Sequence, residues 1–214
     1  MKKHVAILGG AFNPITKGHI ETACFIKERL KWLDELWLMP AYTHTFNKNM
    51  ISPKHRLNIC KLAINKKYTH SHCFKIFDYE IKNKIAGGTL HLYNILKNDK
   101  KYKDYEFFWI IGMDNANIID KWVNYRELIK IVKFIVVPRY GVERNLSKNW
   151  YCKYPHIFLE SYHYLFEVSS TKVRTLLTDY YKTKSFDILI ELRNYIEIPV
   201  LNYILKNKLY EKTN

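Results

Sequence analysis

The sequence predicts an α/β fold: a Rossmann-like, doubly wound parallel sheet of about five to six strands with a C-terminal helical hairpin. Three observations support this prediction. Apolar runs of strand length alternate with helix-like segments, which is typical of βαβ units. Most of these runs are continuously apolar, as expected for strands that are buried on both faces. The chain has 214 residues, 48% of them hydrophobic, so we expect one domain over residues 1–214.

Each predicted strand is a short apolar run that ends near a glycine, a proline or a polar segment. VAIL precedes a glycine pair, FFWIIG ends in glycine and KFIVVP ends in proline. In chain order the candidates are residues 5–8, 35–40, 73–78, 107–112, 133–138 and 156–159. Ligands of such sheets bind beyond the carboxyl ends of the strands, so the loops after these runs are the candidate site.

The segments between the strands carry helix signals. Residues 18–32 repeat apolar side chains at helical spacing, and Ser52 and Pro53 supply the cap and first residue of a helix over 53–66. The other candidates are residues 89–97, 125–131, 171–181, 186–195 and 199–210. We expect the C-terminal helices, about residues 171–210, to pack on the domain through their apolar stripe.

The stretch GGAFNPITKGHI, residues 9–20, follows the first predicted strand. Gly9 and Gly10 carry no side chains, so a ligand can approach their backbone closely. A helix is predicted to begin near Gly18, and its free N–H groups favour an anion. Thr16 and His19 are three residues apart, so both side chains can face that anion. The stretch matches neither the P-loop nor the GxGxxG pattern, but it predicts a phosphate site of the same kind.

A second hydroxyl-rich stretch, SSTKVR, lies at residues 169–174. Ser169, Ser170 and Thr171 can cap a helix and offer hydroxyl and N–H groups to a ligand. Arg174 lies four residues after Ser170, so its guanidinium can reach the same face. The stretch therefore predicts a second anion site, with an ordinary capped helix as the alternative interpretation.

Together the two motifs resemble those of the nucleotidyltransferase superfamily of α/β phosphodiesterases, whose members carry a (His/Thr)-x-Gly-His loop and a late Ser-Ser/Thr-Thr-x-x-Arg helix start. Within it the chain resembles the bacterial-type nicotinate and nicotinamide mononucleotide adenylyltransferases. The loop joins FNPIT, as in eukaryotic members, to KGH, as in bacterial ones. Further similar stretches, in the same order as in the family, are MPAYTHTFNK, SPKHRLNICKLAI, GGTLHLYNIL, GMDNANIIDKW and KFIVVPR.

The resemblance implies an enzyme of NAD biosynthesis that transfers AMP from ATP to nicotinate or nicotinamide mononucleotide, or to both. The products would be the dinucleotide and pyrophosphate. The attacking 5′-phosphate has a second pKa near 6, so it is mostly a dianion at neutral pH and needs no general base. Mg²⁺ would accompany ATP, held mainly by phosphates and water without dedicated protein ligands.

The resemblance also implies roles for individual residues. The catalytic residues would be His19, Thr16 and Arg174, which would bind the phosphates of ATP. The ATP-binding residues would be Leu8, Gly9, Gly10, Ala11, Phe12, Gly18, Gly112, Asp114, Ser169, Ser170 and Thr171. The pyridine-nucleotide-binding residues would be Thr89, Trp122, Lys48 and Arg139.

Several of these assignments have a structural alternative, and the chain departs from the family in three places, one of them the Ser-Tyr-Thr motif, which is eroded in GGTLHLYNIL. Asp114 would bind ribose hydroxyls or cap a helix, Trp122 would stack on the pyridine ring or fill the core, and Lys48 would reach a phosphate or stay solvated. Asn13 stands where bacterial members have aspartate, and Thr16 stands where they have the first histidine. The residues do not decide between nicotinate and nicotinamide.

The formal net charge is +15. It predicts either a nucleic-acid-binding surface or a lysine-rich composition spread over the whole surface. We favour the second, because no basic run of about 5–8 residues occurs, and we expect no nucleic-acid partner. A positive surface would still attract nucleotide anions.

The lengths of apolar runs and the spacing of metal-binding residues argue against a membrane partner and a metal site. No apolar run approaches the roughly 20 residues of a membrane span, and the run at 5–8 is too short for a signal peptide. We therefore expect no membrane partner and a cytoplasmic protein, with the nucleus as an alternative location. A homo-oligomer is left open. HSHC, residues 70–73, lacks a fourth metal ligand nearby, so we expect no metal site.

Two other functions compete with the first. Another nucleotidyltransferase of the superfamily, a phosphopantetheine adenylyltransferase or a cytidylyltransferase, would share both phosphate motifs but lack the pairing of Asp114 with Trp122. A basic nucleic-acid-binding protein would bind DNA or RNA with a steep salt dependence and release no pyrophosphate.

Overall fold

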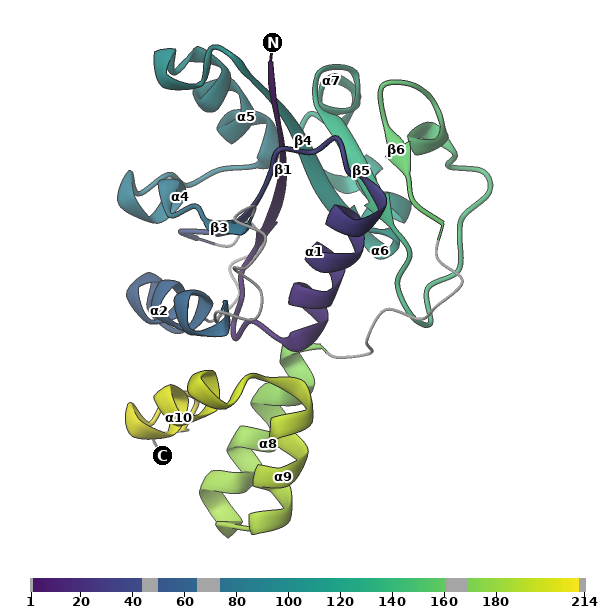
Figure 1. The fold of residues 1–214 in the computed structure, drawn as a ribbon. Coiled ribbons are helices and arrows are strands. Elements are labelled where there is room, and N and C mark those ends of the chain that lie inside the picture. Colours follow the sequence, from purple (N-terminus) through teal and green to yellow (C-terminus); the bar gives the residue numbers. More distant parts are fainter. Residues whose placement is uncertain (1, 44–49, 65–73, 161–168, 212–214) are drawn as a thin grey trace.

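The computed structural model describes residues 2–43, 50–64, 74–160 and 169–211. Its centre is a six-stranded sheet in the order β3-β2-β1-β4-β5-β6, in which all pairs are parallel. β1 is central, and Ala6 pairs with Leu36 on one side and with Phe108 on the other. The predicted fold class is confirmed (Figure 1).

The six strands coincide with the six predicted apolar runs. The interior strands are the longest, and their central residues are buried, because helices cover both of their faces. The two strands at the edges of the sheet are shorter than predicted and span only three and two residues. The bounds are β1 Lys3–Gly10, β2 Glu35–Pro40, β3 Phe74–Ile76, β4 Tyr105–Gly112, β5 Lys133–Val137 and β6 Ile157–Phe158.

One face of the sheet shares its core with α1 (Lys17–Arg29) and α2 (Pro53–Ala63). The C-terminal helices α8 (Ser170–Thr183), α9 (Phe186–Tyr195) and α10 (Ile198–Lys206) extend the same core. In Figure 1 they lie together below the sheet, beyond the carboxyl ends of its strands. This side of the core includes Ala6, Ile26, Leu36, Ile59, Phe108, Ile135, Val173, Leu192 and Ile204.

The other face packs against α5 (Thr89–Asn98), α6 (Met113–Asn117) and α7 (Tyr125–Ile131). The short helix α4 (Tyr79–Lys82) borders it, and 3₁₀ turns lie at Lys100–Tyr102, Ile119–Lys121 and Trp150–Cys152. Its buried residues include Val5, Ile7, Trp37, Leu92, Trp109, Ala116, Leu128 and Val136. The sheet is therefore covered on both faces, which explains the continuous apolar runs.

The helix predictions differ from the structure mainly at the ends. The helices predicted at 125–131 and 186–195 have the predicted bounds, and Ser52 caps α2, with its hydroxyl accepting a hydrogen bond from the N–H of His55 (3.4 Å). α1 ends at Arg29, and α10 ends at Lys206 instead of Tyr210. The helices α4 and α6 were not predicted, because four or five residues are too few to show helical periodicity.

The HSHC stretch, residues 70–73, lies outside the described residues. Among the described helices, none is long and apolar enough to cross a membrane.

Candidate active site

A pocket of about 330 Å³ opens at the carboxyl edge of the sheet, between the ends of β1 and β4. The chain continues from β1 to β2 on one side and later enters β4 on the other, so this is the switch point at which ligands of such sheets bind. The predicted residues that line it are Leu8, Gly9, Gly10, Thr16, Gly18, His19, Gly112, Trp122 and Arg139. The structure thus brings together residues that are up to 131 positions apart in the chain (Leu8 to Arg139).

Thr16 and His19 form a reciprocal pair at the start of α1. Thr16 is the N-cap residue, and its backbone N–H donates to Nδ1 of His19 at 3.0 Å. The Thr16 hydroxyl oxygen lies 2.7 Å from the same nitrogen. Because Nδ1 accepts a hydrogen bond, the proton of the neutral imidazole belongs on Nε2. The sequence prediction that both side chains lie at one site is confirmed, and Nε2–H is the donor that remains for an anion.

The protein around His19 keeps its imidazole neutral. Burial and the positive charge of Arg139 lower the pKa of His19 from 6.5 to about 4. The ring also meets Phe12 edge-on, with 5.2 Å between the ring centroids. At neutral pH the pocket therefore presents an uncharged N–H donor at a fixed position.

The second predicted motif packs directly against the first. The hydroxyl of Ser170 donates to the carbonyl of Pro14 at 2.8 Å, and Nη1 of Arg174 donates to the carbonyl of Asn13 at 2.9 Å. Nη2 of Arg174 also donates to the hydroxyl of Thr171 at 3.0 Å. Segments more than 150 residues apart in sequence, such as 13–14 and 170–174, therefore form one structural unit.

These contacts give the second motif a role in holding the first loop. Ser169 caps α8 as predicted, because its side chain accepts a hydrogen bond from the N–H of Lys172 at 3.1 Å. Arg174, Ser170 and Thr171 are not among the residues that line the described pocket. Contact of Arg174 with the phosphates of ATP stays a prediction.

Asp114 and Arg139 meet at the end of β4, where Arg139 lines the pocket and Asp114 does not. Nη1 of Arg139 donates to Oδ2 of Asp114, while Oδ1 of Asp114 is buried and has no hydrogen-bond partner among the described residues. A buried acceptor without a partner is costly, so it points to a donor supplied by a ligand, such as a ribose hydroxyl. The helix-cap alternative is wrong, because Gly112 holds the N-cap position of α6. A β-carbon on Gly112 would lie 2.5 Å from Asp114 Oδ1, which explains the glycine.

The residues predicted to bind the pyridine nucleotide are not all together. Trp122 is half-buried, lines the pocket and packs on the core, so it contributes to the core while its stacking on the pyridine ring stays a prediction. Thr89 is the first residue of α5 and is not among the lining residues. Lys48 lies outside the described residues.

Two residues of the predicted ATP loop lie beneath the pocket and do not line it. Phe12 is buried, with a positive φ of 44°, and the carbonyl of Ala11 accepts a hydrogen bond from Nη1 of Arg56 at 2.9 Å. They shape the loop from below.

The sequence prediction missed several pocket residues. Thr22, Asn115 and Pro138 line the pocket with the predicted residues. Thr22 lies three residues after His19 on α1, so helical spacing would have indicated it. Asn115 sits next to Asp114 in a helix that the sequence did not reveal.

Arg56 is the other residue that the prediction missed, and it is completely buried. Besides Ala11, its guanidinium donates to the carbonyls of Ala41, Tyr42 (2.9 Å) and Ile51 (3.1 Å). A single side chain therefore ties together the loop after β1, the loop after β2 and the residues before α2. It lies in the stretch SPKHRLNICKLAI, which resembles the family, but the sequence predicted no role for Arg56.

Glu80 of α4 completes this layer beneath the pocket. Its Oε2 accepts a hydrogen bond from the N–H of Tyr42 at 3.1 Å. Burial raises the pKa of Glu80 from 4.5 to about 7, although this hydrogen bond and nearby Arg56 act in the opposite direction.

Comparisons with known proteins agree with this geometry. A sequence model of the cytidylyltransferase-like family matches residues 7–176. The probable nicotinate-nucleotide adenylyltransferase of Bacillus licheniformis is 31% identical over 98% of this chain and 99% of its own. That of Streptococcus mutans is 31% identical over 98% of this chain and 90% of its own.

Solved structures show the same fold. Plasmodium falciparum nicotinic acid mononucleotide adenylyltransferase, complexed with NaAD, has a TM-score of 0.80 at 24% identity, with 97% of each chain covered. A second structure of that protein, complexed with APC, has a TM-score of 0.77. The sequence identity to the relatives extends over almost the whole chain. The chain therefore belongs to the cytidylyltransferase-like family of nucleotidyltransferases and, within it, to the nicotinate-nucleotide adenylyltransferases.

Proposed function

We propose that this enzyme transfers AMP from ATP to nicotinate mononucleotide and releases pyrophosphate. One observation carries the proposal: a single pocket has the Thr16–His19 pair on one side and the half-buried Trp122 on another. The first suits the phosphates of ATP, and the second suits the flat pyridinium ring of the acceptor. The names of the relatives favour nicotinate over nicotinamide as the acceptor base.

In the proposed reaction an oxygen of the acceptor's 5′-phosphate attacks the α-phosphorus of ATP. A new P–O bond forms, the bond from the α-phosphorus to the bridging oxygen breaks, and pyrophosphate leaves with the negative charge. The attacking phosphate is already mostly a dianion at neutral pH. The protein therefore contributes positioning and charge stabilisation instead of a general base.

The residues at the start of α1 would supply that stabilisation. Nε2–H of His19 and the first N–H groups of α1 would bind the phosphates as charge develops on pyrophosphate. The free carboxylate oxygen of Asp114 would accept a hydrogen bond from a ribose hydroxyl. Arg174 would approach the phosphates from the second motif while it holds the carbonyl of Asn13.

Mg²⁺ would enter with ATP. Within the described residues no group of three metal-binding side chains exists, and none of the pocket-lining residues is acidic. This donor set suits a cation that is held by phosphate oxygens and water, whose chemistry is to neutralise charge on the phosphates.

A direct assay tests the proposal. The purified protein is incubated with ATP, Mg²⁺ and either nicotinate or nicotinamide mononucleotide, and pyrophosphate and dinucleotide are measured. We expect both products, with a larger kcat/KM for nicotinate mononucleotide. Pyrophosphate release with phosphopantetheine, or with CTP and an alcohol phosphate, but with neither mononucleotide would identify another nucleotidyltransferase instead.

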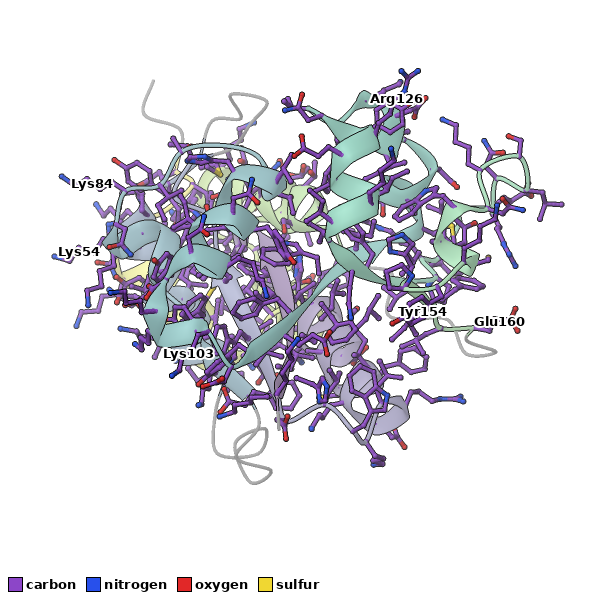
Figure 2. All side chains as sticks on the ribbon, turned by 90° about the horizontal axis from the view of Figure 1, so that it is seen from above. Lys54, Lys84, Lys103, Arg126, Tyr154 and Glu160 are labelled. Carbon is purple, nitrogen blue, oxygen red and sulfur yellow. The ribbon has the colours of Figure 1, made fainter. Side chains whose placement is uncertain are left out.

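The basic surface is not needed for this reaction. The exposed Lys54, Lys84, Lys103 and Arg126 come from different segments, and in Figure 2 Lys54 and Lys84 lie at the left, Lys103 at the lower left and Arg126 at the upper right. This spread favours composition over a nucleic-acid site. A salt titration of binding to a DNA or RNA duplex checks this, and we expect only weak binding at physiological ionic strength.

Three further properties belong to the same proposal. We expect residues 1–214 to unfold as one unit in calorimetry, the protein to fractionate with the cytoplasm, and its substrates to be small molecules. Whether it forms a homo-oligomer is measured by analytical ultracentrifugation.

A further inference from the structure

Asn13 lies within the predicted ATP loop, and its side chain is buried, with an exposed fraction of 5%. Its Oδ1 accepts a hydrogen bond from the N–H of Ile51 at 3.3 Å and another from the hydroxyl of Tyr210 at 3.0 Å. Two donors on one amide oxygen fix which way the amide points. Its backbone carbonyl is held separately by Arg174.

Tyr210 reaches Asn13 from the C-terminal end of the chain. After α10 ends, the N–H of Leu209 bonds to the carbonyl of Ile204 at 3.0 Å, and the Leu209 side chain enters the core. Tyr210 then adopts a φ of 67°, a conformation that is uncommon for a residue with a large side chain. The backbone is thus held in an unfavourable turn that places the phenol against a residue 197 positions earlier.

We propose that Tyr210 is a positioning residue of the nucleotide site: through Asn13 it holds the loop that carries Thr16 and His19. The C-terminal segment then belongs to the ATP site, although it is not among the residues that line the described pocket. This inference depends on the proposed function, because it assigns the loop to ATP.

The hydrogen bond from Tyr210 to Asn13 is suited to hold the loop over the whole working pH range. Burial raises the pKa of Tyr210 far above its ordinary value, against the opposing effect of Arg174 and Arg56, so the hydroxyl stays a donor at every working pH. The ring of Tyr210 also packs against the core of the C-terminal helices. Removing only the hydroxyl would therefore leave the ring in place and remove one of the two hydrogen bonds described above for Oδ1 of Asn13.

A small displacement of this loop would affect the reaction. Asn13 stands two residues before Ile15 and three before Thr16, whose N–H orients His19. A shift of about 1 Å in a positioning element can reduce the rate by roughly 100-fold. Loss of one hydrogen bond usually causes a smaller shift, so we expect a smaller reduction in rate.

The test compares two tyrosines that pack on the same core. Y210F removes the hydroxyl that reaches the loop, while Y181F removes a hydroxyl that donates to the carbonyl of Ile204 at 3.4 Å, within the C-terminal helices. We expect Y210F to lower kcat/KM for ATP by about 5- to 20-fold, with little change in KM for the mononucleotide. Y181F should keep wild-type kinetics, and both variants should melt within a few degrees of each other.

A double-mutant cycle shows whether Tyr210 acts through Asn13. N13A should lower kcat/KM for ATP at least as much as Y210F, and the N13A/Y210F double variant should be no worse than N13A alone. Independent, multiplied losses, or wild-type kinetics in Y210F, would overturn the proposal.

Calorimetric binding of ATP without the acceptor separates this inference from the proposed function. If the wild type binds ATP but transfers nothing to either mononucleotide, the proposed function is wrong, while weaker ATP binding by Y210F than by Y181F would still support the role of Tyr210. If ATP binds equally to both variants and to the wild type, and kcat is also unchanged in Y210F, Tyr210 has no role in positioning the site.

Discussion

The two ends of the pocket are built in different ways. The loop that carries Thr16 and His19 is held by hydrogen bonds from Arg56, Arg174, Ser170 and Tyr210, which come from widely separated parts of the chain. The end with Trp122 and Arg139 depends on side chains: Trp122 is half-buried, and half of the Arg139 side chain is exposed although it pairs with Asp114.

The difference follows the needs of the proposed reaction. Charge develops on the leaving phosphates, and stabilising it requires donors that are already in place. A planar ring needs only a flat surface, which a partly exposed aromatic side chain supplies without a rigid framework. We therefore expect changes at the first end to affect kcat and changes at the second to affect KM.

The largest effect is expected from H19A at the first end. Loss of the Nε2–H donor should lower kcat by about 100- to 1,000-fold, because a preorganised donor is removed where charge develops. Steady-state kinetics with saturating ATP and acceptor measures it. H91A, which changes an exposed histidine on α5, is the control and should keep wild-type turnover. Turnover within a few-fold of wild type in H19A would show that His19 has no catalytic role.

A smaller effect is expected from W122A at the second end. Loss of ring stacking should raise KM for the pyridine nucleotide by about 2- to 10-fold and change KM for ATP little. W32A is the control, because Trp32 is also partly exposed but packs on Phe108. Equal increases in both KM values would mean that Trp122 supports the whole pocket instead of the ring.

The smallest effect is expected from E80Q in the layer beneath the first end, and it concerns stability. The pKa of Glu80 is raised to about 7 by burial, so the folded protein holds this proton more tightly than the unfolded chain does. Stability from Glu80 is therefore present below its ordinary pKa of 4.5 and is lost as pH rises through about 7. Glutamine stays neutral and avoids this loss.

Melting temperatures at several pH values measure this difference. E80Q should melt a few degrees above the wild type at pH 8, and the gap should close near pH 5. E160Q removes the same charge from an exposed side chain and measures the general effect of net charge. A gap that stays constant with pH would contradict the raised pKa.

The positions of the strands along the chain and the loop at residues 9–20 could be predicted because both depend on local sequence. Continuous apolar runs mark buried strands, and glycines before Thr16 and His19 mark a phosphate loop. The roles within the site were less predictable. The contact of Arg174 with phosphates stays a prediction, and its hydrogen bond to the carbonyl of Asn13 was not predicted, because a spacing of four residues does not reveal what lies opposite the helix.

Residues that support the site from distant parts of the chain leave no recognisable pattern in the sequence. Arg56 resembles any lysine or arginine on a helix, and only the fold shows that it is fully buried among backbone carbonyls. Tyr210 follows the last helix and looks like part of its apolar stripe. Asn115 and the unpaired oxygen of Asp114 depend on a five-residue helix, which is too short for periodicity to show.

The way Arg56 holds the loops has an evolutionary consequence. Its bonds go to the main-chain oxygens of Ala11, Ala41, Tyr42 and Ile51, and main-chain oxygens are present whatever residue occupies the position. The loops can therefore accept new side chains by mutation while they keep their shape.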